Sequence, residues 1–218
     1  MPILSEDQKK ILALVADDET LAGAFYLTGG TALAEYYLGH RLSEDLGFFA
    51  EEEFEPLAIS AFFKKIETKA GIRKITYEQS FNRNLFFLEL KSDGIKTEFT
   101  YFPFPRIEKG KKIGKLDVDS LLDIAVNKLF TIYQKPRTRD FIDLYCILQK
   151  EKTWTLDDLI VKAQIKFDHF LEPLQLSGQF TKAETLKDYP KMLQTLPDTE
   201  WQSFFMSEAK RIAQKQLE

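Results

Sequence analysis

The chain has 218 residues, of which 44% are hydrophobic and 29% charged, and this balance excludes a disordered protein. No apolar run approaches the roughly 20 residues that span a bilayer, and the N-terminus lacks an export pattern, so no membrane partner is expected. The net charge of −4 gives no overall attraction for nucleic acid, and a single cysteine excludes an internal disulfide and predicts a cytoplasmic protein.

The N-terminal half alternates between helical and strand patterns. A helix capped by Ser5 is predicted first, then a short strand that ends at a Gly-Gly turn, a helix that ends at Gly39, a strand, and a helix with Pro56 near its start and Gly71 past its end. These elements correspond to residues 5–18, 23–30, 31–39, 44–50 and 56–71.

Three strand-like runs follow, at residues 72–80, 84–92 and 95–104, with a hairpin turn signal in "SDG" between the last two. Prolines, glycines and lysines in residues 102–115 break the pattern, and beyond them the period is helical almost throughout. The expected fold is therefore α+β, with a mixed β-sheet and flanking helices in residues 1–113 and a helical C-terminal domain in residues 114–218.

A glycine turn is the first candidate for chemistry. Gly29, Gly30 and Thr31 lie between a predicted strand and a helix start, where backbone N–H groups are free to bind phosphate oxygens. Glycine allows a phosphate to approach closely, and Thr31 can cap the helix or donate a further hydrogen bond. A plain structural turn is the alternative for this pattern.

Carboxylates on two strands are the second candidate. Residues two apart on a strand share a face, so Asp45 points to the same side as position 47, which is Gly47. Nucleotide transfer usually needs two or three carboxylates that converge on Mg²⁺. On the later strand, Lys96, Glu98 and Thr100 alternate with apolar residues, and Glu98 is either a further ligand or an exposed strand glutamate.

The third candidate is helical. Lys128 lies at the margin of one apolar stripe, Asp140 lies at the edge of the next, and Asp143 is placed on the far side of that second stripe. These residues form either a functional group or a structural salt bridge between helices. Cys146, in the same apolar helix, is expected to be a structural thiol rather than a nucleophile.

A basic segment, residues 106–115, carries five bases and one acid. It is either a solvated connection or a phosphate-binding patch that contacts the backbone of a nucleic acid. The two histidines, His40 and His169, are far apart in sequence, which argues against a histidine-rich metal site.

In their order along the chain, "LTGGTALAEYYLGHRLSEDLGFF" and "LLDIAVNKLF…RTRDFIDLYCIL" resemble the nucleotidyltransferase AbiEii family of type IV toxin–antitoxin and abortive-infection systems. The resemblance implies a nucleotidyltransferase fold of the polymerase-β type. It also implies binding of a nucleoside triphosphate (NTP) with Mg²⁺, and transfer of a nucleotide to a nucleic-acid acceptor, which in some members is tRNA. An antitoxin encoded nearby would oppose the toxin's effect without binding it directly.

The resemblance also assigns roles to single residues. Gly29, Gly30 and Thr31 match the phosphate-binding turn, and Asp45 matches the first metal-binding acid, with Glu98 in the place of a further acid. Lys128 would pair with the triphosphate, and Asp140 or Asp143 would orient Lys128 or the incoming substrate. The segment before Asp45 supplies two further nucleotide-binding residues, Arg41 and Ser43.

The sequence departs from the family pattern at one position. The family has Asp-x-Asp, whereas this chain has Asp45–Leu46–Gly47, and loss of a metal-binding carboxylate is expected to lower the rate by several orders of magnitude. The first hypothesis is an NTP- and Mg²⁺-dependent nucleotidyltransferase. The alternatives are a catalytically impaired pseudoenzyme that binds a nucleotide or a partner, and a purely structural interaction protein.

Overall fold

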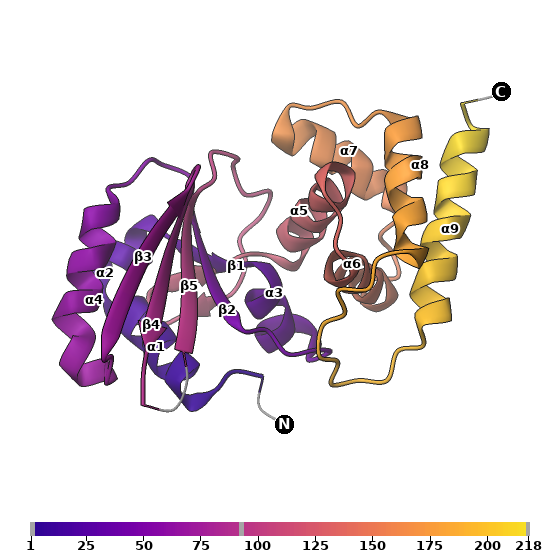
Figure 1. Cartoon of the computed structure of the whole chain (residues 1–218). Coiled ribbons are helices and arrows are strands. Elements are labelled where there is room, and N and C mark those ends of the chain that lie inside the picture. The colour runs from indigo at the N-terminus through magenta and orange to yellow at the C-terminus, as the bar shows by residue number, and fades with distance from the viewer. Residues whose placement is uncertain (1–2, 92–93, 217–218) are drawn as a thin grey trace. The chain divides into compact units, whose positions relative to one another are not determined.

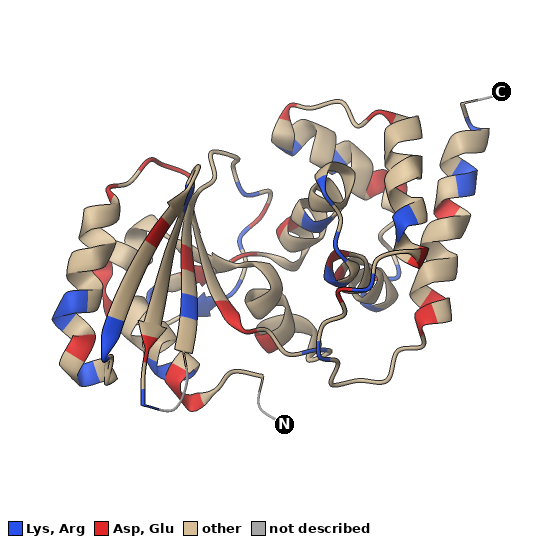
Figure 2. Ribbon diagram, in the orientation of Figure 1, with Lys and Arg blue, Asp and Glu red and all other residues tan. Residues whose placement is uncertain are grey.

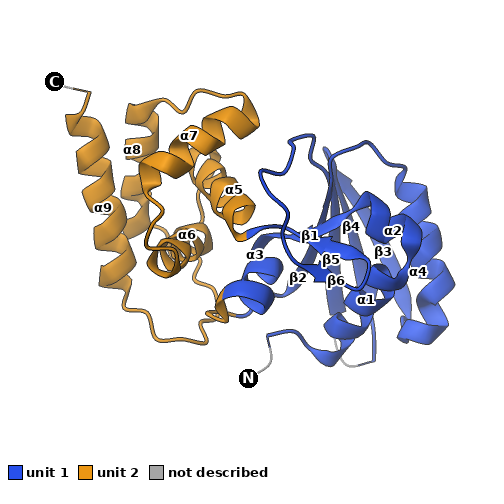
Figure 3. Ribbon diagram, turned by 180° about the vertical axis from the view of Figure 1, so that it is seen from behind, with its two compact units in different colours: residues 1–37, 42–120 blue, residues 38–41, 121–218 orange. Residues whose placement is uncertain are grey.

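The computed structural model describes residues 3–91 and 94–216. The chain forms two compact units, which we call the sheet unit (residues 1–37 and 42–120) and the helical unit (residues 38–41 and 121–218) (Figure 3). No helix within the described ranges combines the length and apolar composition that crossing a bilayer requires. The limits predicted from sequence, 1–113 and 114–218, remain a prediction about which segments fold as domains.

A seven-stranded mixed sheet organises the described part of the sheet unit, with the strand order β3-β4-β5-β2-β1-β7-β6. Figure 1 labels its strands β1 to β5. Strand β2 pairs antiparallel with β1 and parallel with β5, and β1 pairs parallel with β7. The strands are β1 (Tyr26–Thr28), β2 (Asp45–Ala50), β3 (Lys74–Ser80), β4 (Arg83–Glu89), β5 (Gly94–Tyr101), β6 (Lys112–Ile113) and β7 (Leu116–Val118).

Capping residues set the ends of two helices of the sheet unit. Ser5 caps the first helix through a capping box with Gln8, as the sequence predicted, and Gly71 ends the fourth helix with φ of 80°, a left-handed conformation that favours glycine. The helices are α1 (Glu6–Asp17), α2 (Glu19–Ala24), α3 (Gly29–Leu33), which continues as a π-helix (Ala34–Leu38), and α4 (Pro56–Ala70).

Aromatic packing fixes α4 on one face of the sheet. The ring of Phe63 on α4 lies 5.3 Å from that of Phe86 on β4, and Phe48 on β2 stacks on Phe99 of β5 at 4.8 Å. These four side chains are fully buried. Because side chains alternate along a strand, the residues between them point to the opposite face, which carries the charged groups described below.

The helical unit packs five α-helices and a short 3₁₀ segment around a second aromatic core. The ring of Phe141 contacts that of Phe205 at 4.8 Å, and Trp201 and Phe180 are also fully buried. The elements are α5 (Leu121–Gln134), α6 (Thr138–Lys150), α7 (Leu156–Phe167), α8 (Pro173–Thr181), the 3₁₀ segment (Lys182–Glu184) and α9 (Asp198–Gln214).

Two expectations from sequence need correction. The segment interpreted as a domain boundary contributes β6 at Lys112–Ile113, and β7 follows it, so the sheet continues into the region predicted to be helical almost throughout. Helix α8 was not predicted at all. The "SDG" hairpin turn falls partly outside the described residues, because these omit residues 92–93.

Candidate functional site

The face of the sheet opposite α4 carries paired charges on three adjacent strands. We call it the polar face and define it by Asp45 and Gly47 on β2, Lys96 and Glu98 on β5, and Arg83 on β4. Asp45 lies opposite Lys96 and Gly47 opposite Glu98 in the parallel β2–β5 register, and residues so paired point to the same side. Figure 2 shows blue and red segments on β5 and a red segment at the start of β2.

Asp45, the first predicted metal-binding acid, is held by a lysine of the neighbouring strand. The Nζ atom of Lys96 donates to Asp45 Oδ2 at 2.7 Å, and the two side chains are 30% and 41% exposed. The contact is a single, partly solvated ion pair. Asp45 is therefore accessible, but its charge is already compensated within the protein.

Glu98 is more tightly held. Arg83 donates from Nε and Nη2 to the two carboxylate oxygens at 2.7 and 2.5 Å, and Thr100 Oγ1 donates to Oε1 at 2.9 Å. Burial alone would raise the pKa of Glu98, but the hydrogen bonds and charge of Arg83 outweigh burial and hold the pKa below its usual value. Glu98 is thus an anion, and both of its oxygens are occupied by Arg83.

Gly47 lies between these groups and the neighbouring strand β1. It pairs with Thr28 on one side and with Glu98 on the other. A Cβ atom built at Gly47 would lie 3.7 Å from the Thr28 carbonyl oxygen, which is ordinary van der Waals contact. The backbone therefore has room for a Cβ atom at the position where the family carries its second aspartate.

The Gly-Gly turn follows Thr28 directly, so it lies beside this part of the polar face. Gly29 has φ of 72°, a conformation that other residues rarely adopt, and it begins helix α3. The hydroxyl of Thr31 is buried and donates to the main-chain oxygen of Asp45, and it also contacts Ser43 Oγ at 2.8 Å. Thr31 and Ser43 thus join the turn to the start of β2.

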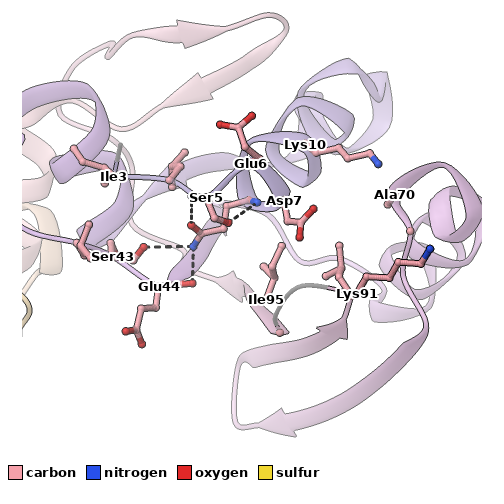
Figure 4. Close-up of a pocket in the computed structure, with 16 residues that line it drawn as sticks. Ile3, Ser5, Glu6, Asp7, Lys10, Ser43, Glu44, Ala70, Lys91 and Ile95 are labelled. Atoms are coloured by element: carbon pink, nitrogen blue, oxygen red, sulfur yellow. Dashed lines mark hydrogen bonds between the residues drawn. The ribbon is translucent and has the colours of Figure 1, made fainter. Parts of the chain in front are cut away.

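A buried glutamine fastens the same segment from the other side. Gln8 on α1 donates from Nε2 to the main-chain oxygens of Glu44 at 2.8 Å and Ser43 at 3.4 Å (Figure 4). Its Oε1 accepts from the backbone N–H of Ser5 at 2.9 Å. These residues lie on the wall of a shallow hollow of about 1100 Å³ that also borders the start of β5. The segment before Asp45 is therefore fixed by two side chains that are far apart in sequence.

Four other predicted site residues come together in the helical unit. Asp143 is fully buried and accepts from Arg41 Nε at 2.6 Å, from Arg41 Nη2 at 2.7 Å and from His40 Nε2 at 2.8 Å. Lys128 Nζ lies 2.6 Å from Asp143 Oδ2 and 2.7 Å from Asp140 Oδ1. The placement of Asp143 on the far side of the apolar stripe was wrong, because α6 buries it against these cations.

The electrostatics of this cluster follow from burial and from neighbouring cations. Burial alone would raise the pKa values of both aspartates, but Lys128, with Arg41 at Asp143 and Arg137 at Asp140, outweighs it. The pKa of Asp140 is lowered, and that of Asp143 is lowered well below its usual value. Both aspartates are therefore anions that hold the cations in fixed positions.

The predicted site residues thus fall into two groups. The sheet unit brings together the glycine turn, Ser43, Asp45 and Glu98. The helical unit brings together Arg41, Lys128, Asp140 and Asp143. Arg41 is buried and bound to Asp143 rather than presented on a surface, although it is only two residues from Ser43.

The Mg²⁺ that the AbiEii resemblance implies can be tested against these residues. Asp45 and Glu98 lie on one face of adjacent strands, and Mg²⁺ commonly uses only one or two carboxylates when phosphates and waters complete its shell. They therefore fit one ion once Lys96 releases Asp45 and Arg83 releases an oxygen of Glu98. A second ion does not fit, since position 47 is glycine and no group of three or more potential ligands from His, Cys, Asp and Glu occurs among residues 3–91 and 94–216.

Sequence reasoning gave no role to several residues that shape these groups. Lys96 was noted only as a polar neighbour of Glu98, although the same alternation that selected Glu98 places Lys96 on its face. His40 adjoins Arg41 in sequence, but its contact with Asp143 spans about a hundred residues, and only the fold reveals it. Gln8 and Arg83 likewise act through contacts between distant segments.

The basic segment is largely neutralised within the sheet unit. Arg106 contacts Glu51 and Asp117, and Lys112 also contacts Asp117. Lys115 contacts the carboxylate of Glu19 on α2, and Lys111 donates to a main-chain oxygen of the π-helix. These partners favour the structural interpretation of residues 106–115 over a free phosphate-binding patch.

Comparisons with known proteins agree with this fold. Residues 10–210 match the family described as nucleotidyl transferase AbiEii toxin, type IV toxin–antitoxin (TA) system. An uncharacterised protein of Aquifex aeolicus is 33% identical over 160 residues, which cover 72% of each chain.

Two crystal structures from Helicobacter pylori share the fold. One is of a candidate nucleotidyltransferase, with a TM-score of 0.61, 22% identity and 99% of both chains covered. The other is of JHP933, with a TM-score of 0.58, 22% identity, and 97% of this chain and 94% of that chain covered. At this identity the two structures support the fold alone, whereas the family match extends over most of the sequence. The chain belongs to the AbiEii nucleotidyltransferase toxin family of type IV toxin–antitoxin systems.

Proposed function

We propose that this chain binds an NTP on the polar face of its sheet unit and transfers the nucleotidyl group to the end of a nucleic acid, with tRNA as the acceptor to test first. The observation that carries the proposal is the convergence of Asp45 and Glu98 on adjacent strands beside the Gly-Gly turn. In the reaction, an acceptor hydroxyl oxygen bonds to the α-phosphorus, the hydroxyl loses its proton, and pyrophosphate leaves.

Each residue of the polar face has a role in this proposal. Gly29 and Gly30 allow the triphosphate to approach the backbone, while Thr31 and Ser43 hold the turn against the start of β2. Asp45 and Glu98 would hold one Mg²⁺, which when bound neutralises phosphate charge. Catalysis by these residues consists mainly of positioning and charge compensation.

In the helical unit, the two buried aspartates are proposed to keep Lys128 and Arg41 in fixed positions. Asp143 and Asp140 orient Lys128 from two sides, and Asp143 fixes Arg41 by a bidentate contact. The family resemblance assigns Lys128 to the triphosphate, and this role remains a prediction. The antitoxin acts in the same cytoplasm by opposing the effect of the transfer, without a direct complex.

A second candidate function, nucleotide binding without transfer, is favoured by the state of the two carboxylates. Asp45 and Glu98 already have protein cations as partners, and Gly47 removes a third carboxylate. In this alternative the family fold persists as a pseudoenzyme that binds a nucleotide or a partner. Its expected rate is several orders of magnitude below that of a complete site, since each factor of ten corresponds to about 1.4 kcal/mol.

One pair of substitutions separates the two functions. Wild type, Asp45→Ala and Gly47→Asp are incubated with each α-labelled NTP, Mg²⁺ and total tRNA, and labelled tRNA is counted. Transfer by wild type that Asp45→Ala abolishes supports the enzyme. Transfer by Gly47→Asp alone supports the pseudoenzyme, and circular dichroism of each variant checks that it is folded. Calorimetry that detects no NTP binding to any of the three proteins contradicts both the enzyme and the nucleotide-binding pseudoenzyme.

A further inference from the structure

Each of the two carboxylates that define the polar face has a protein cation as its partner. Lys96 contacts Asp45 and Arg83 contacts Glu98, so the four charges sum to zero. A face that recruits divalent ions normally presents an excess of carboxylate, because the ion supplies the positive charge. At Asp45 and Glu98 this excess is lacking, because each carboxylate already has a protein cation as its partner, which points to a source of positive charge within the chain.

The two ion pairs are not equivalent. Arg83 is fixed by a bidentate contact to Glu98, whose side chain is only 15% exposed and also accepts from Thr100. Lys96 makes one contact with Asp45, and both side chains are partly exposed. Such a pair contributes little to stability, and an ammonium on a flexible stem can exchange one anion for another. Lys96 is therefore the cation that can move.

The position of Lys96 suits a phosphate group. It lies directly opposite Asp45 in the strand register, and the next residue along β2 on the same face is Gly47, which has no side chain to fill the space beside it. Thr28, the partner of Gly47 on β1, leads into the Gly-Gly turn. Lysine is a common phosphate ligand and binds the oxygens as a point charge.

We propose that Lys96 is a built-in counter-cation for the triphosphate, so that NTP binding to the polar face does not require a divalent ion. The inference rests on the proposed nucleotide binding and identifies the residue that supplies its charge. Without nucleotide, Lys96 neutralises Asp45 and weakens metal binding there. With nucleotide, the ammonium moves from Asp45 to a phosphate oxygen.

The test measures the affinity of the full chain for each NTP by calorimetry, once in EDTA and once in millimolar MgCl₂. For wild type, the two dissociation constants are expected to agree within about threefold, a small change on the scale of about tenfold per 1.4 kcal/mol. Lys96→Met is expected to lose about tenfold or more in EDTA, the value of one charge-assisted hydrogen bond, and far less in MgCl₂. Lys96→Arg keeps the charge and should retain binding in EDTA.

A second readout uses Mn²⁺ alone, measured by electron paramagnetic resonance. Lys96→Met frees the Asp45 carboxylate and is expected to bind Mn²⁺ severalfold more tightly than wild type, whereas Lys96→Met with Asp45→Asn should lose this gain. Lys64→Met is the matched control, because Lys64 has a similar ion pair, with Glu67, on helix α4. It should change neither readout.

The outcomes distinguish the inference from the proposed function. Wild-type binding that requires MgCl₂ overturns the role of Lys96 and leaves the proposed function standing. An equal loss in EDTA and in MgCl₂ for Lys96→Met also overturns it, since a purely structural residue would act in this way. Absence of NTP binding in both media, for wild type and all variants, overturns the proposed function together with the inference.

Discussion

At the scale of single residues, substitution of Asp143 is expected to lower the stability of the protein strongly. It is fully buried and accepts from Arg41, His40 and Lys128, so it compensates two buried cations. A buried ion pair need not stabilise a protein relative to apolar residues, but removal of one partner leaves the other charge without compensation. Asp143 is therefore expected to stabilise the fold of the helical unit, whatever its part in chemistry.

Asp143→Asn is expected to lower the free energy of unfolding by about 3 kcal/mol, because Arg41 and Lys128 remain buried without that negative charge. The measurement is urea denaturation followed by circular dichroism. Asp157→Asn is the control, since Asp157 also contacts two cations but is half exposed, and its loss should cost at most about 1 kcal/mol. Equal losses for the two variants would contradict this account.

The buried aspartates also predict how stability depends on pH. The pKa values of Asp140 and Asp143 are lowered in the folded chain from the ordinary 3.8, so the unfolded chain binds more protons in acid. Their contribution is complete above about pH 5 and is lost as the pH falls through the lowered values. The urea concentration at the unfolding midpoint, measured at a series of pH values, should decrease once the pH is below about 5. This decrease should be smaller for Asp143→Asn. An identical profile for the variant would refute this assignment.

Cys146 is predicted to be a slow nucleophile. Burial, and to a smaller extent the charge of Asp143, raises the pKa of its thiol from 9.0 to about 11. Two pKa units correspond to about a hundredfold less thiolate near pH 8, so alkylation by iodoacetamide should be about a hundredfold slower than in urea-unfolded protein. The rate is measured by mass spectrometry. A native rate within a few-fold of the unfolded rate would contradict the environment described for this thiol.

At the scale of elements, the sequence predicted those whose signals are local. The Ser5 cap, the Gly71 end of α4 and the alternation of β5 depend on neighbouring residues, and the structure confirms all three. Strand β7 is only three residues long and gains its partners from β1, which lies about ninety residues earlier, so no local pattern could reveal it. Short strands completed by distant chain segments are the part of this fold that periodicity could not predict.

The same difference between local patterns and long-range contacts applies to the candidate site. Alternation placed Asp45 on the same side as position 47 and Glu98 on a polar face, and the family resemblance selected Lys128 and the two aspartates. The sequence pattern alone did not predict the ion-pair partner of any of these residues. The contacts of Asp45 with Lys96, Glu98 with Arg83 and Asp143 with Arg41 are set by strand register and by helix packing, which depend on the whole fold.

Helix α1 is predicted to protect the segment that precedes Asp45 from local opening. Gln8→Glu keeps the acceptor for the Ser5 N–H but loses the donor to the carbonyls of Ser43 and Glu44. Hydrogen exchange of residues 42–46 is expected to accelerate about tenfold, as one hydrogen bond is worth about 1 kcal/mol and the orphaned carbonyls add to the loss. Ser5→Ala, which removes the cap but keeps this donor, should leave their exchange nearly unchanged. Similar protection in both variants would contradict the role of Gln8.

At the scale of the whole molecule, the chain crosses between its two units three times. Residues 38–41 leave the sheet unit, join the helical unit and return to it before β2. Within the helical unit, His40 O accepts from the backbone N–H of Leu193 at 2.8 Å, and Arg41 forms an isolated bridge with Met192. The helical unit is therefore incomplete without a segment that lies about eighty residues before its main part.

This connectivity predicts that fragments 1–120 and 121–218 associate when mixed. The second fragment contains Asp143, Lys128 and the strand-like segment near Met192, but it lacks residues 38–41, which only the first can supply. Size-exclusion chromatography should show a complex, and calorimetry should give a dissociation constant on the order of micromolar, about −8 kcal/mol. Asp143→Asn in the second fragment removes the charge that binds Arg41 and should weaken association about tenfold or more, whereas Asp157→Asn should not. If both fragments show native circular dichroism and elute separately, residues 38–41 are not needed to complete the helical unit.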